Sequence, residues 1–220
     1  MAKLYKLTDG DGKTLNGTQW GPGVSHSGTG EGGLCGPGWI HAYEHPLIAV
    51  LLNPTHANFQ NPRLWEAEGE VGLRDGQLKC GCKTLTTVRE IPLPSITTEM
   101  RVRFAILCAR EAATADAAWK EWEAWADRWL SGGDRSGASA DAAATAARAT
   151  YDAAARAAYD AAAWAAEAAY RAAYDAADAA ADAAAEAAYR ASWEASWAVA
   201  KTRVGTDIFA IAEKACSGLT

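Results

Sequence analysis

The first half of the chain alternates short apolar runs with turn residues, a pattern typical of strands joined by loops. The first run is KLYKL (residues 3–7), and the glycines and aspartates of TDGDGK predict a turn after it. In residues 64–71 apolar or small residues alternate with three glutamates, which predicts a strand with one solvated face. Residues 83–91 (KTLTTVREI) predict another strand, and two prolines close the domain after it.

Between these runs the pattern predicts one more strand and one helix. Residues 39–43 (WIHAY) have the aromatic and β-branched character of a strand. Pro46 suits the first turn of a helix, which we expect to end at Asn53-Pro54. Together these elements predict an N-terminal mixed α+β domain over residues 1–97.

From Ile96 onward the apolar positions follow a helical period. Four tryptophans then recur every three or four residues, so they share one face that must be buried: Trp119, Trp122, Trp125 and Trp129. Ser131-Gly132-Gly133 predicts the end of this helix. We therefore expect residues 98–133 to form connecting Trp-rich helices.

Residues 134–220 are dominated by alanine and predict a long α-helical segment with a short C-terminal tail. No glycine or proline lies between residues 138 and 204. Charged residues recur with a period slightly above 3.6, which favours a right-handed supercoil, and their signs mostly alternate. A continuous helix of this length would span about 90 Å.

Two rows of this helix are almost pure alanine, and a row of Tyr and Trp residues runs beside the charged stripe. A face of small residues lets another helix approach closely, so we expect a homo-oligomer. The predicted interface residues are Ala161, Ala165, Ala176, Tyr159, Tyr170 and Tyr174. The alternatives are packing against the Trp-rich helix, a solvated single helix, and a bent helix that folds back on itself.

The composition narrows the classes of function and location. The formal net charge is −6 and the chain has no basic cluster, which argues against a nucleic-acid partner. The N-terminus has no signal-peptide pattern, and the longest apolar run is too short for a bilayer. The odd number of cysteines, five, suggests reduced thiols in a cytosolic protein. We expect no membrane association, metal or cofactor.

Several motifs suggest chemistry, each with a simpler structural explanation. GDGKT (residues 10–14) contains the end of a phosphate-binding loop, but Leu7 replaces the required glycine, so we expect a hairpin turn. A zinc site could combine two histidines with two thiols, His41, His45, Cys80 and Cys82. Satisfied structural histidines and buried thiols are the alternative.

Two further groups could support catalysis or binding. Glu66, Glu68 and Glu70 could act as acid–base carboxylates or form a solvated sheet face, and Cys35 with His41 could form a nucleophilic pair. The glycine-dense residues 16–38 could form a ligand loop or an ordinary surface loop. The candidate ligand-binding side chains there are Trp20, His26 and Trp39. No residue is assigned a catalytic role.

Motifs in the first half resemble an uncharacterised family of bacteriophage-encoded domains. The matching segments are Lys3–Leu7, Cys35–Leu47, Glu66–Val71 and Val88–Ile91. Members of that family often carry alanine-rich C-terminal segments, as this chain does. The resemblance implies a phage or prophage origin and a place in the host cytoplasm or the virion, with a host or virion protein as a further candidate partner. It implies no activity.

The first strand, the WIH strand and the following helix are also similar to ADP-ribosyltransferase-like folds. That resemblance implies a nucleotide pocket in which Glu90 takes the catalytic position and His41 lines the pocket with Tyr5 or Lys6. The first-strand Arg or His of those folds is absent here, and no E-x-E pair lies near Glu90.

The sequence therefore supports two hypotheses. The first is a non-enzymatic phage protein that self-associates through its alanine-rich helix and displays the N-terminal domain in assembly, decoration or host interaction. The alternative is a nucleotide-binding or degenerate transferase-like domain that acts on or sequesters a host nucleotide signal.

Overall fold

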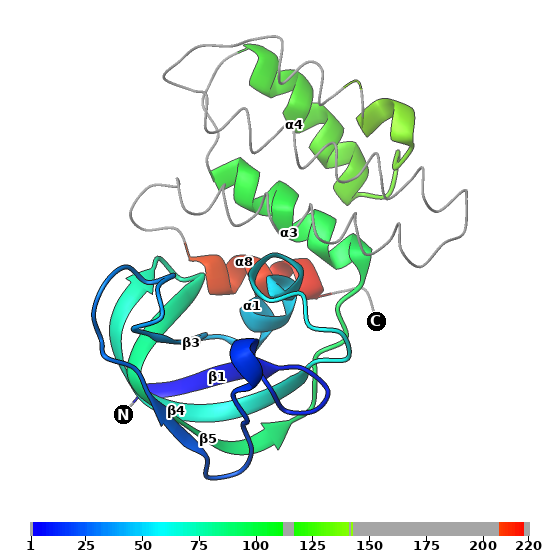
Figure 1. Cartoon of the computed structure of the whole chain (residues 1–220). Coiled ribbons are helices and arrows are strands. Elements are labelled where there is room, and N and C mark those ends of the chain that lie inside the picture. The colour runs from blue at the N-terminus through cyan, green and yellow to red at the C-terminus, as the bar shows by residue number, and fades with distance from the viewer. Residues whose placement is uncertain (1, 112–116, 141, 143–206, 218–220) are drawn as a thin grey trace. The chain divides into compact units, whose positions relative to one another are not determined.

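An antiparallel sheet and several helices make up the described part of the chain, so the predicted α+β class is confirmed. The computed structural model describes residues 2–111, 117–140, 142 and 207–217. The chain divides into two compact units, Met1–Ser95 and Ile96–Thr220. The first contains the sheet with two short helices, and the described elements of the second are helices (Figure 1).

The centre of the first unit is a long hairpin of β4 (Arg63–Asp75) and β5 (Lys79–Ile91). The register between the two strands shifts at three places, each an irregularity of the bulge type. Bulges increase the local twist, which coils a long hairpin instead of leaving it flat. One edge of the hairpin pairs with β1 (Ala2–Thr8), and the other pairs with β2 (Ser25–Ser27) and β3 (Ile40–Ala42).

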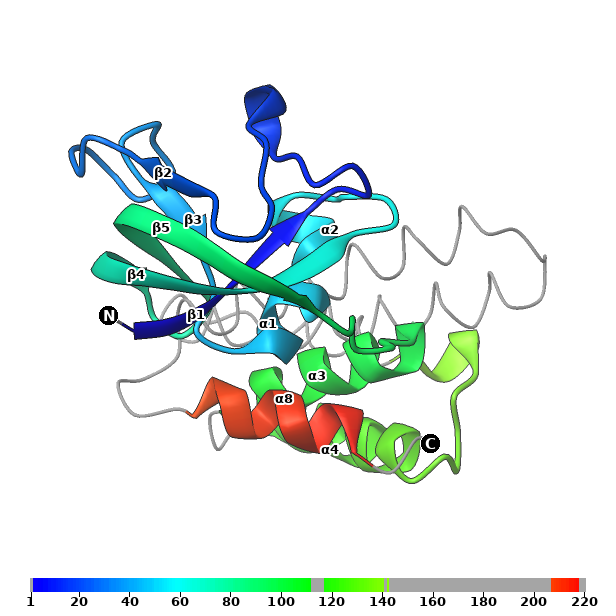
Figure 2. The same cartoon turned by 90° about the horizontal axis from the view of Figure 1, so that it is seen from below.

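The sheet closes on itself where β1 meets the residue that follows β3. The amide of Tyr5 donates to the carbonyl of Tyr43 at 2.8 Å, and the amide of Tyr43 donates back at 2.9 Å. The ring of strands is therefore β1–β4–β5–β3–β1, a small barrel whose curvature is visible in Figure 2. Closure satisfies strand edges that would otherwise invite pairing with other chains.

The alternating pattern of the strands places one set of side chains inside this barrel. The buried core contains Leu4, Trp20, Ala42, Ala67, Cys80, Cys82 and Leu85. On β4, Trp65, Ala67 and Gly69 are buried, whereas Glu68 and Glu70 are exposed on the other face. The prediction of a strand with one solvated face is confirmed, although the strand is longer than the predicted segment.

Two short helices, α1 (Pro46–Leu51) and α2 (Asn53–His56), follow β3, and α1 packs against β1. The His45 side chain caps α1, and Pro46 occupies its first turn as predicted. Asn53-Pro54 does not simply end the helix, because a second helix begins there. Pro54 lies in the first turn of α2, where its missing N–H would have had no partner within the helix. The Asn53 side chain accepts from the Phe59 amide and donates to the Phe59 carbonyl, which holds the following loop.

The described helices of the second unit are α3 (Thr98–Glu111), α4 (Ala117–Leu130) and α8 (Ile208–Cys216), and α3 contacts both others. The hydroxyl of Thr97 accepts from the Met100 amide, and the Asp207 carboxylate caps α8. The predicted stop after α4 is confirmed by Gly132, which has a φ of 77°. The helix α8 lies where we expected only a tail.

The predicted tryptophan face of α4 is confirmed for the three side chains that the structure describes. Trp122, Trp125 and Trp129 are 0%, 1% and 4% exposed. The side chain of Trp119 lies outside the described residues. Two ion pairs involve α3. Arg110 of α3 pairs with Asp127 of α4, and Glu99 of α3 pairs with Arg135, which follows α4.

Most of the alanine-rich segment lies outside the described residues, although residues 137–140 and 142 are helical. The predicted interface residues all lie outside the described residues: Ala161, Ala165, Ala176, Tyr159, Tyr170 and Tyr174. None of the described helices has both the length and the apolar character that a bilayer crossing requires.

Candidate functional site

The first part of the glycine-dense segment folds over one end of the barrel and inserts Trp20 into its core. Trp20 is 3% exposed, and its indole N–H donates to the Thr14 hydroxyl at 3.0 Å. The ring of His26 meets the Trp20 ring edge-on with 4.6 Å between centroids, and its Nε2 lies 2.8 Å from the Gln19 carbonyl. Two of the predicted ligand-binding side chains are therefore neighbours, held by the protein itself.

Lys6 lies beside Trp20 and is only 7% exposed, which the sequence pattern did not indicate. Its ammonium donates to the His41 carbonyl at 2.7 Å and lies 4.9 Å from the centroid of the Trp20 ring. Burial lowers the pKa of Lys6 to about 8, partly opposed by the nearby thiols of Cys82 and Cys80. A cation–π contact and one hydrogen bond thus hold a charge that burial disfavours.

The second part of the segment folds back on the outer face of the hairpin. The indole N–H of Trp39 donates to the Gly32 carbonyl at 3.0 Å. A Cβ added to Gly81 would lie 2.6 Å from Leu34 Cδ1 and 3.0 Å from Trp39 Cβ, so the strand needs glycine here. Trp39, 8% exposed, is packed against backbone and is not presented to solvent.

The four residues of the predicted zinc site do not come together. His41 pairs with Gly81, so its side chain leaves β3 on the face opposite to Cys80 and Cys82, which are buried inside the barrel. His45 caps α1 instead. Among the residues that the structure describes, no three His, Cys, Asp or Glu side chains gather as a metal ion would require.

His41 has a structural role on its own face. Its Nε2 is bonded to the Leu34 carbonyl, and burial lowers the pKa of the imidazole. The Cys35 thiol, for which His41 was a candidate base, instead accepts from Lys79 Nζ at 3.2 Å. The geometry therefore pairs the thiol with an amine, not with an imidazole.

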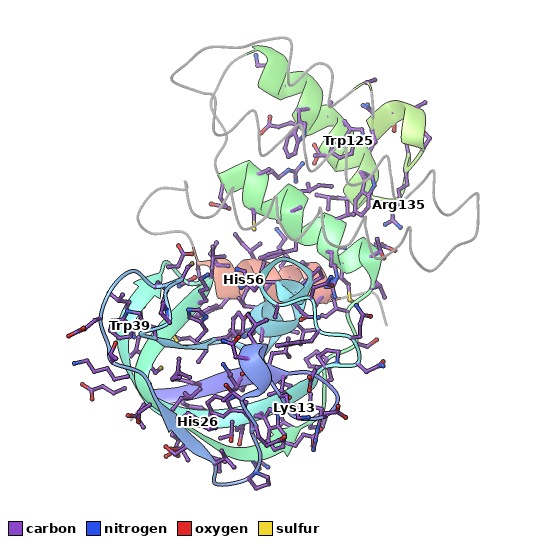
Figure 3. The ribbon with its side chains drawn as sticks, in the orientation of Figure 1. Lys13, His26, Trp39, His56, Trp125 and Arg135 are labelled. Carbon is purple, nitrogen blue, oxygen red and sulfur yellow. The ribbon has the colours of Figure 1, made fainter. Side chains whose placement is uncertain are left out.

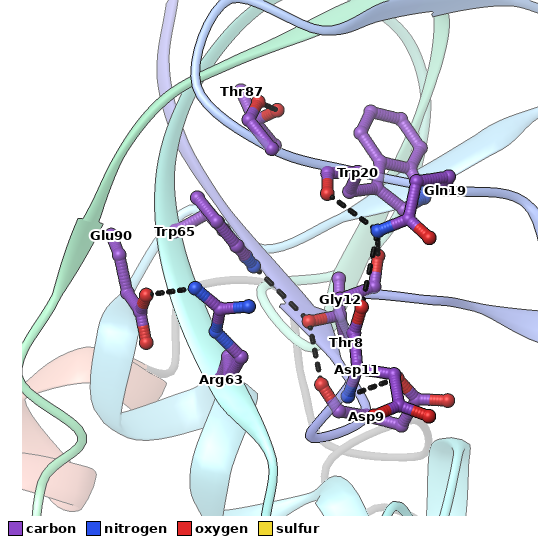
Figure 4. A network of polar contacts seen from close by, with 11 residues as sticks. Thr8, Asp9, Asp11, Gly12, Gln19, Trp20, Arg63, Trp65, Thr87 and Glu90 are labelled. Carbon is purple, nitrogen blue, oxygen red and sulfur yellow. Dashed lines mark hydrogen bonds and ion pairs between the residues drawn. The ribbon is translucent and has the colours of Figure 1, made fainter.

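Glu90 belongs to a network at the end of the barrel that also contains Arg63, Trp65 and Thr8 (Figure 4). Its carboxylate pairs with Arg63, which lowers the pKa of Glu90. The Arg63 guanidinium lies 4.8 Å from the Trp65 ring centroid, and the Trp65 indole donates to the Thr8 hydroxyl at 3.1 Å. Glu90 is thus held in an exposed ion pair with the guanidinium that covers the Trp65 ring.

The three glutamates of β4 do not form a catalytic pair. Glu66 lies 2.6 Å from Arg89 and 2.8 Å from Lys3. Hydrogen bonds from Arg89 and then Lys3 lower the pKa of Glu66 to about 2, which suits an ion pair and not a general acid. Glu68 and Glu70 are exposed, as a solvated sheet face predicts.

Loop 9–13 is a turn, as expected. The Asp9 carboxylate accepts from the amides of Asp11 and Lys13 at 3.0 and 2.7 Å, and Lys13 bridges to Gln19 in antiparallel fashion. The side chain of Gln19 also bonds the carbonyls of this turn (Figure 4).

Sequence reasoning missed a buried pair between Tyr43 and His56. The Tyr43 hydroxyl lies 3.1 Å from His56 Nδ1, and the rings stack with 5.8 Å between centroids. Burial, with the charge of Lys79 as a smaller cause, lowers the pKa of His56 to about 4, and burial raises the pKa of Tyr43. The alternation in WIHAY assigns the Tyr43 side chain to one face of the strand, but it does not indicate that His56 is the residue it contacts.

Figure 3 places His26 and Trp39 over separate parts of the barrel, so the predicted ligand-binding residues form no single cluster. Comparison of the chain with protein-family models, curated proteins and solved structures found no match. The resemblances to phage domains and to transferase-like folds stay predictions, and no known protein supplies an activity for this arrangement.

Proposed function

We propose that the protein is a non-enzymatic, self-associating protein that displays its barrel unit to a partner. The observation that carries this proposal is the use of the candidate side chains within the barrel itself. Trp20 fills the core, Trp39 packs against backbone, and Glu90 pairs with Arg63. Groups that would stack on or bond to a nucleotide thereby contact other parts of the barrel unit: Trp20 and Trp39 pack the glycine-dense segment on the sheet, and Glu90 pairs across β4 and β5.

Loops fixed in this way suit recognition by a larger partner. Backbone bonds tie the segment to the sheet at several points, such as Gly28 to Lys83 and Gly23 to Thr87. The Thr87 hydroxyl also donates to the Gly21 carbonyl at 2.6 Å. A rigid scaffold that positions surface loops is a common basis for binding, because little conformational entropy is lost on association.

The alanine-rich segment would supply the self-association. We propose a long helix that packs with copies of itself in a bundle or coiled-coil-like arrangement through its alanine rows, because small side chains allow close approach. Joined copies would present several barrels at once, and multivalent display raises avidity without new contacts. A role in phage assembly, decoration or host interaction is part of the proposal and derives from the family resemblance.

Light scattering coupled to gel filtration tests this function on the full chain. We expect a mass above that of the monomer at tens of micromolar protein. Leucine at Ala161, Ala165 and Ala176 should lower the mass, because overpacking costs about 1–3 kcal/mol per site. Circular dichroism is the control, since leucine preserves helix propensity. A parent that runs as a monomer would remove the proposal.

A ligand screen separates display from the nucleotide hypothesis. Thermal-shift measurements with NAD, ADP-ribose and cyclic nucleotides should leave the melting temperature unchanged at millimolar ligand. Binding to the folded state raises stability by mass action, so stabilisation by several degrees would favour a nucleotide-handling domain instead.

A further inference from the structure

Cys35 and Lys79 bring a thiol and an amine into contact from distant parts of the barrel unit. Lys79 Nζ lies 3.2 Å from Cys35 Sγ, and the two residues are 44 positions apart in the sequence. Cys35 belongs to the loop before β3, and Lys79 begins β5. The pair therefore joins the glycine-dense segment to the central hairpin.

The residues around Cys35 hold the thiol in this position. The amide of Gly36 donates to the Gly33 carbonyl at 2.8 Å, which forms a tight turn with Cys35 inside it. The carbonyl of Leu34 is bonded to His41 Nε2. The turn that contains Cys35 is thus closed by its own backbone bond and tied to β3 through Leu34, and Lys79 is part of a paired strand.

The chain's other thiols differ from Cys35 in exposure. Cys80, Cys82 and Cys108 are buried, Cys216 is half-buried, and Cys35 alone is exposed. All five are free thiols. An oxidant in solution would therefore reach Cys35 first, and the nucleophile next to it is the Lys79 amine.

We propose that Cys35 and Lys79 form a reversible covalent cross-link when a peroxide oxidises the thiol. In the first step the thiolate sulfur attacks one peroxide oxygen and the O–O bond breaks. The released hydroxide takes a proton from the Lys79 ammonium and leaves as water, so Cys35 becomes a sulfenic acid and Lys79 a neutral amine. In the second step the neutral Lys79 amine attacks the sulfur. An S–N bond forms, the S–O bond breaks, and the hydroxyl leaves with an amine proton as water, which gives a sulfenamide.

This bond would fasten the loop that carries Trp39 to the start of β5. A cross-link between residues far apart in sequence restricts the unfolded chain, so the oxidised barrel should be more stable. A thiol reductant attacks the sulfur and restores both side chains, so the state of the bond would follow the redox conditions. The inference is independent of self-association.

The test uses the full chain, first reduced, then treated with hydrogen peroxide and digested with trypsin. We expect a peptide that joins the Cys35 and Lys79 segments and has two hydrogens fewer than their sum, with no cleavage after Lys79. Dithiothreitol should release the two peptides. The melting temperature of the oxidised protein should rise and return after reduction.

Three variants control the assignment. Cys35→Ser should abolish the linked peptide, and so should Lys79→Arg, which keeps the positive charge but is a poor nucleophile. Lys83→Arg changes another lysine of β5 and should leave the link intact. A wild-type Cys35 that ends as sulfinic acid while trypsin still cleaves at Lys79 would overturn the proposal, as would a linked Cys35 peptide in the Lys79→Arg variant.

Discussion

Trp39 of the barrel unit and the tryptophans of the helical unit are buried against different kinds of surface. In the barrel, Trp39 lies against strand backbone at Gly81, where a Cβ has no room. In the helical unit, Trp122 and Trp125 pack on each other with 5.9 Å between ring centroids. Contact between two large side chains is lost when one of them is replaced by a smaller residue. Contact of a side chain with glycine is lost when the glycine is replaced by a larger residue. At these positions the two units should therefore be sensitive to opposite substitutions.

Their charged groups differ as well. The barrel buries the Lys6 ammonium next to its core, where one carbonyl and one aromatic ring stabilise it. In the helical unit, the Arg135 guanidinium pairs with Glu99 and lies 4.8 Å from the Trp129 ring, with Arg135 still exposed. An exposed pair of this kind contributes little to stability, whereas an interior charge affects stability strongly.

The largest effect should come from truncating the tryptophan face. Trp122→Ala removes a fully buried ring, and such changes cost about 3–5 kcal/mol. Denaturant unfolding should show the loss in the helical unit. Glu123→Ala alters the exposed neighbour and should be nearly neutral. If both variants unfold like the parent, the aromatic core of the helical unit is wrongly described.

A smaller effect should come from Lys6→Met, through the pH dependence of stability. The folded pKa of Lys6 is lowered from 10.5 to about 8, so between these values the unfolded chain binds more protons. The contribution of Lys6 to the free energy of unfolding therefore rises with pH across that window and is least favourable below pH 8. At 1.36 kcal/mol per pH unit the full change is about 3 kcal/mol.

The difference in unfolding free energy between the parent and Lys6→Met isolates this group, because tyrosine and cysteine ionisation is common to both. We expect the unfolding free energy of Lys6→Met, relative to that of the parent, to be highest at pH 7 and lowest at pH 10.5. A difference that does not vary with pH would show that the ammonium is solvated in the folded protein.

The smallest of these effects should come from Gly81→Ala in the barrel. The new methyl group would meet Leu34 and Trp39, and overpacking costs about 1–3 kcal/mol. Gly33→Ala is the matched control, since nothing lies within 4 Å of its added Cβ. Equal stability of the two variants would mean that the loop before β3 is not packed on the hairpin.

The strands and helices with strong periodicity were predictable from the sequence, as were the turn after β1 and the end of α4, but the long-range pairing that closes the barrel was not. Alternation in residues 64–71 and the tryptophan spacing in α4 each report a local period, which burial then follows. Closure of the barrel depends on bulges and on the Tyr5–Tyr43 pairing. These long-range features have no local pattern in the sequence.

The same limit applies to the candidate site. The density of glycine indicated that the segment between Asn16 and Gly38 is a loop, but it did not indicate how that loop is used. Glycine allows close packing of the backbone as readily as it allows a ligand to approach. The burial of Lys6 was missed because lysine in an alternating strand is normally assigned to the solvated face. The contact of Cys35 with Lys79 joins residues that no motif connects.

The central claim is that the barrel is complete within the first unit and can be displayed independently of the helices. The most direct measurement is an amide correlation spectrum of residues 1–95 expressed alone, compared with the full chain. We expect well-dispersed peaks that overlay those of the barrel in the full chain, with slow hydrogen exchange for the Tyr5 and Tyr43 amides. A collapsed spectrum, or fast exchange at these two amides, would contradict the account.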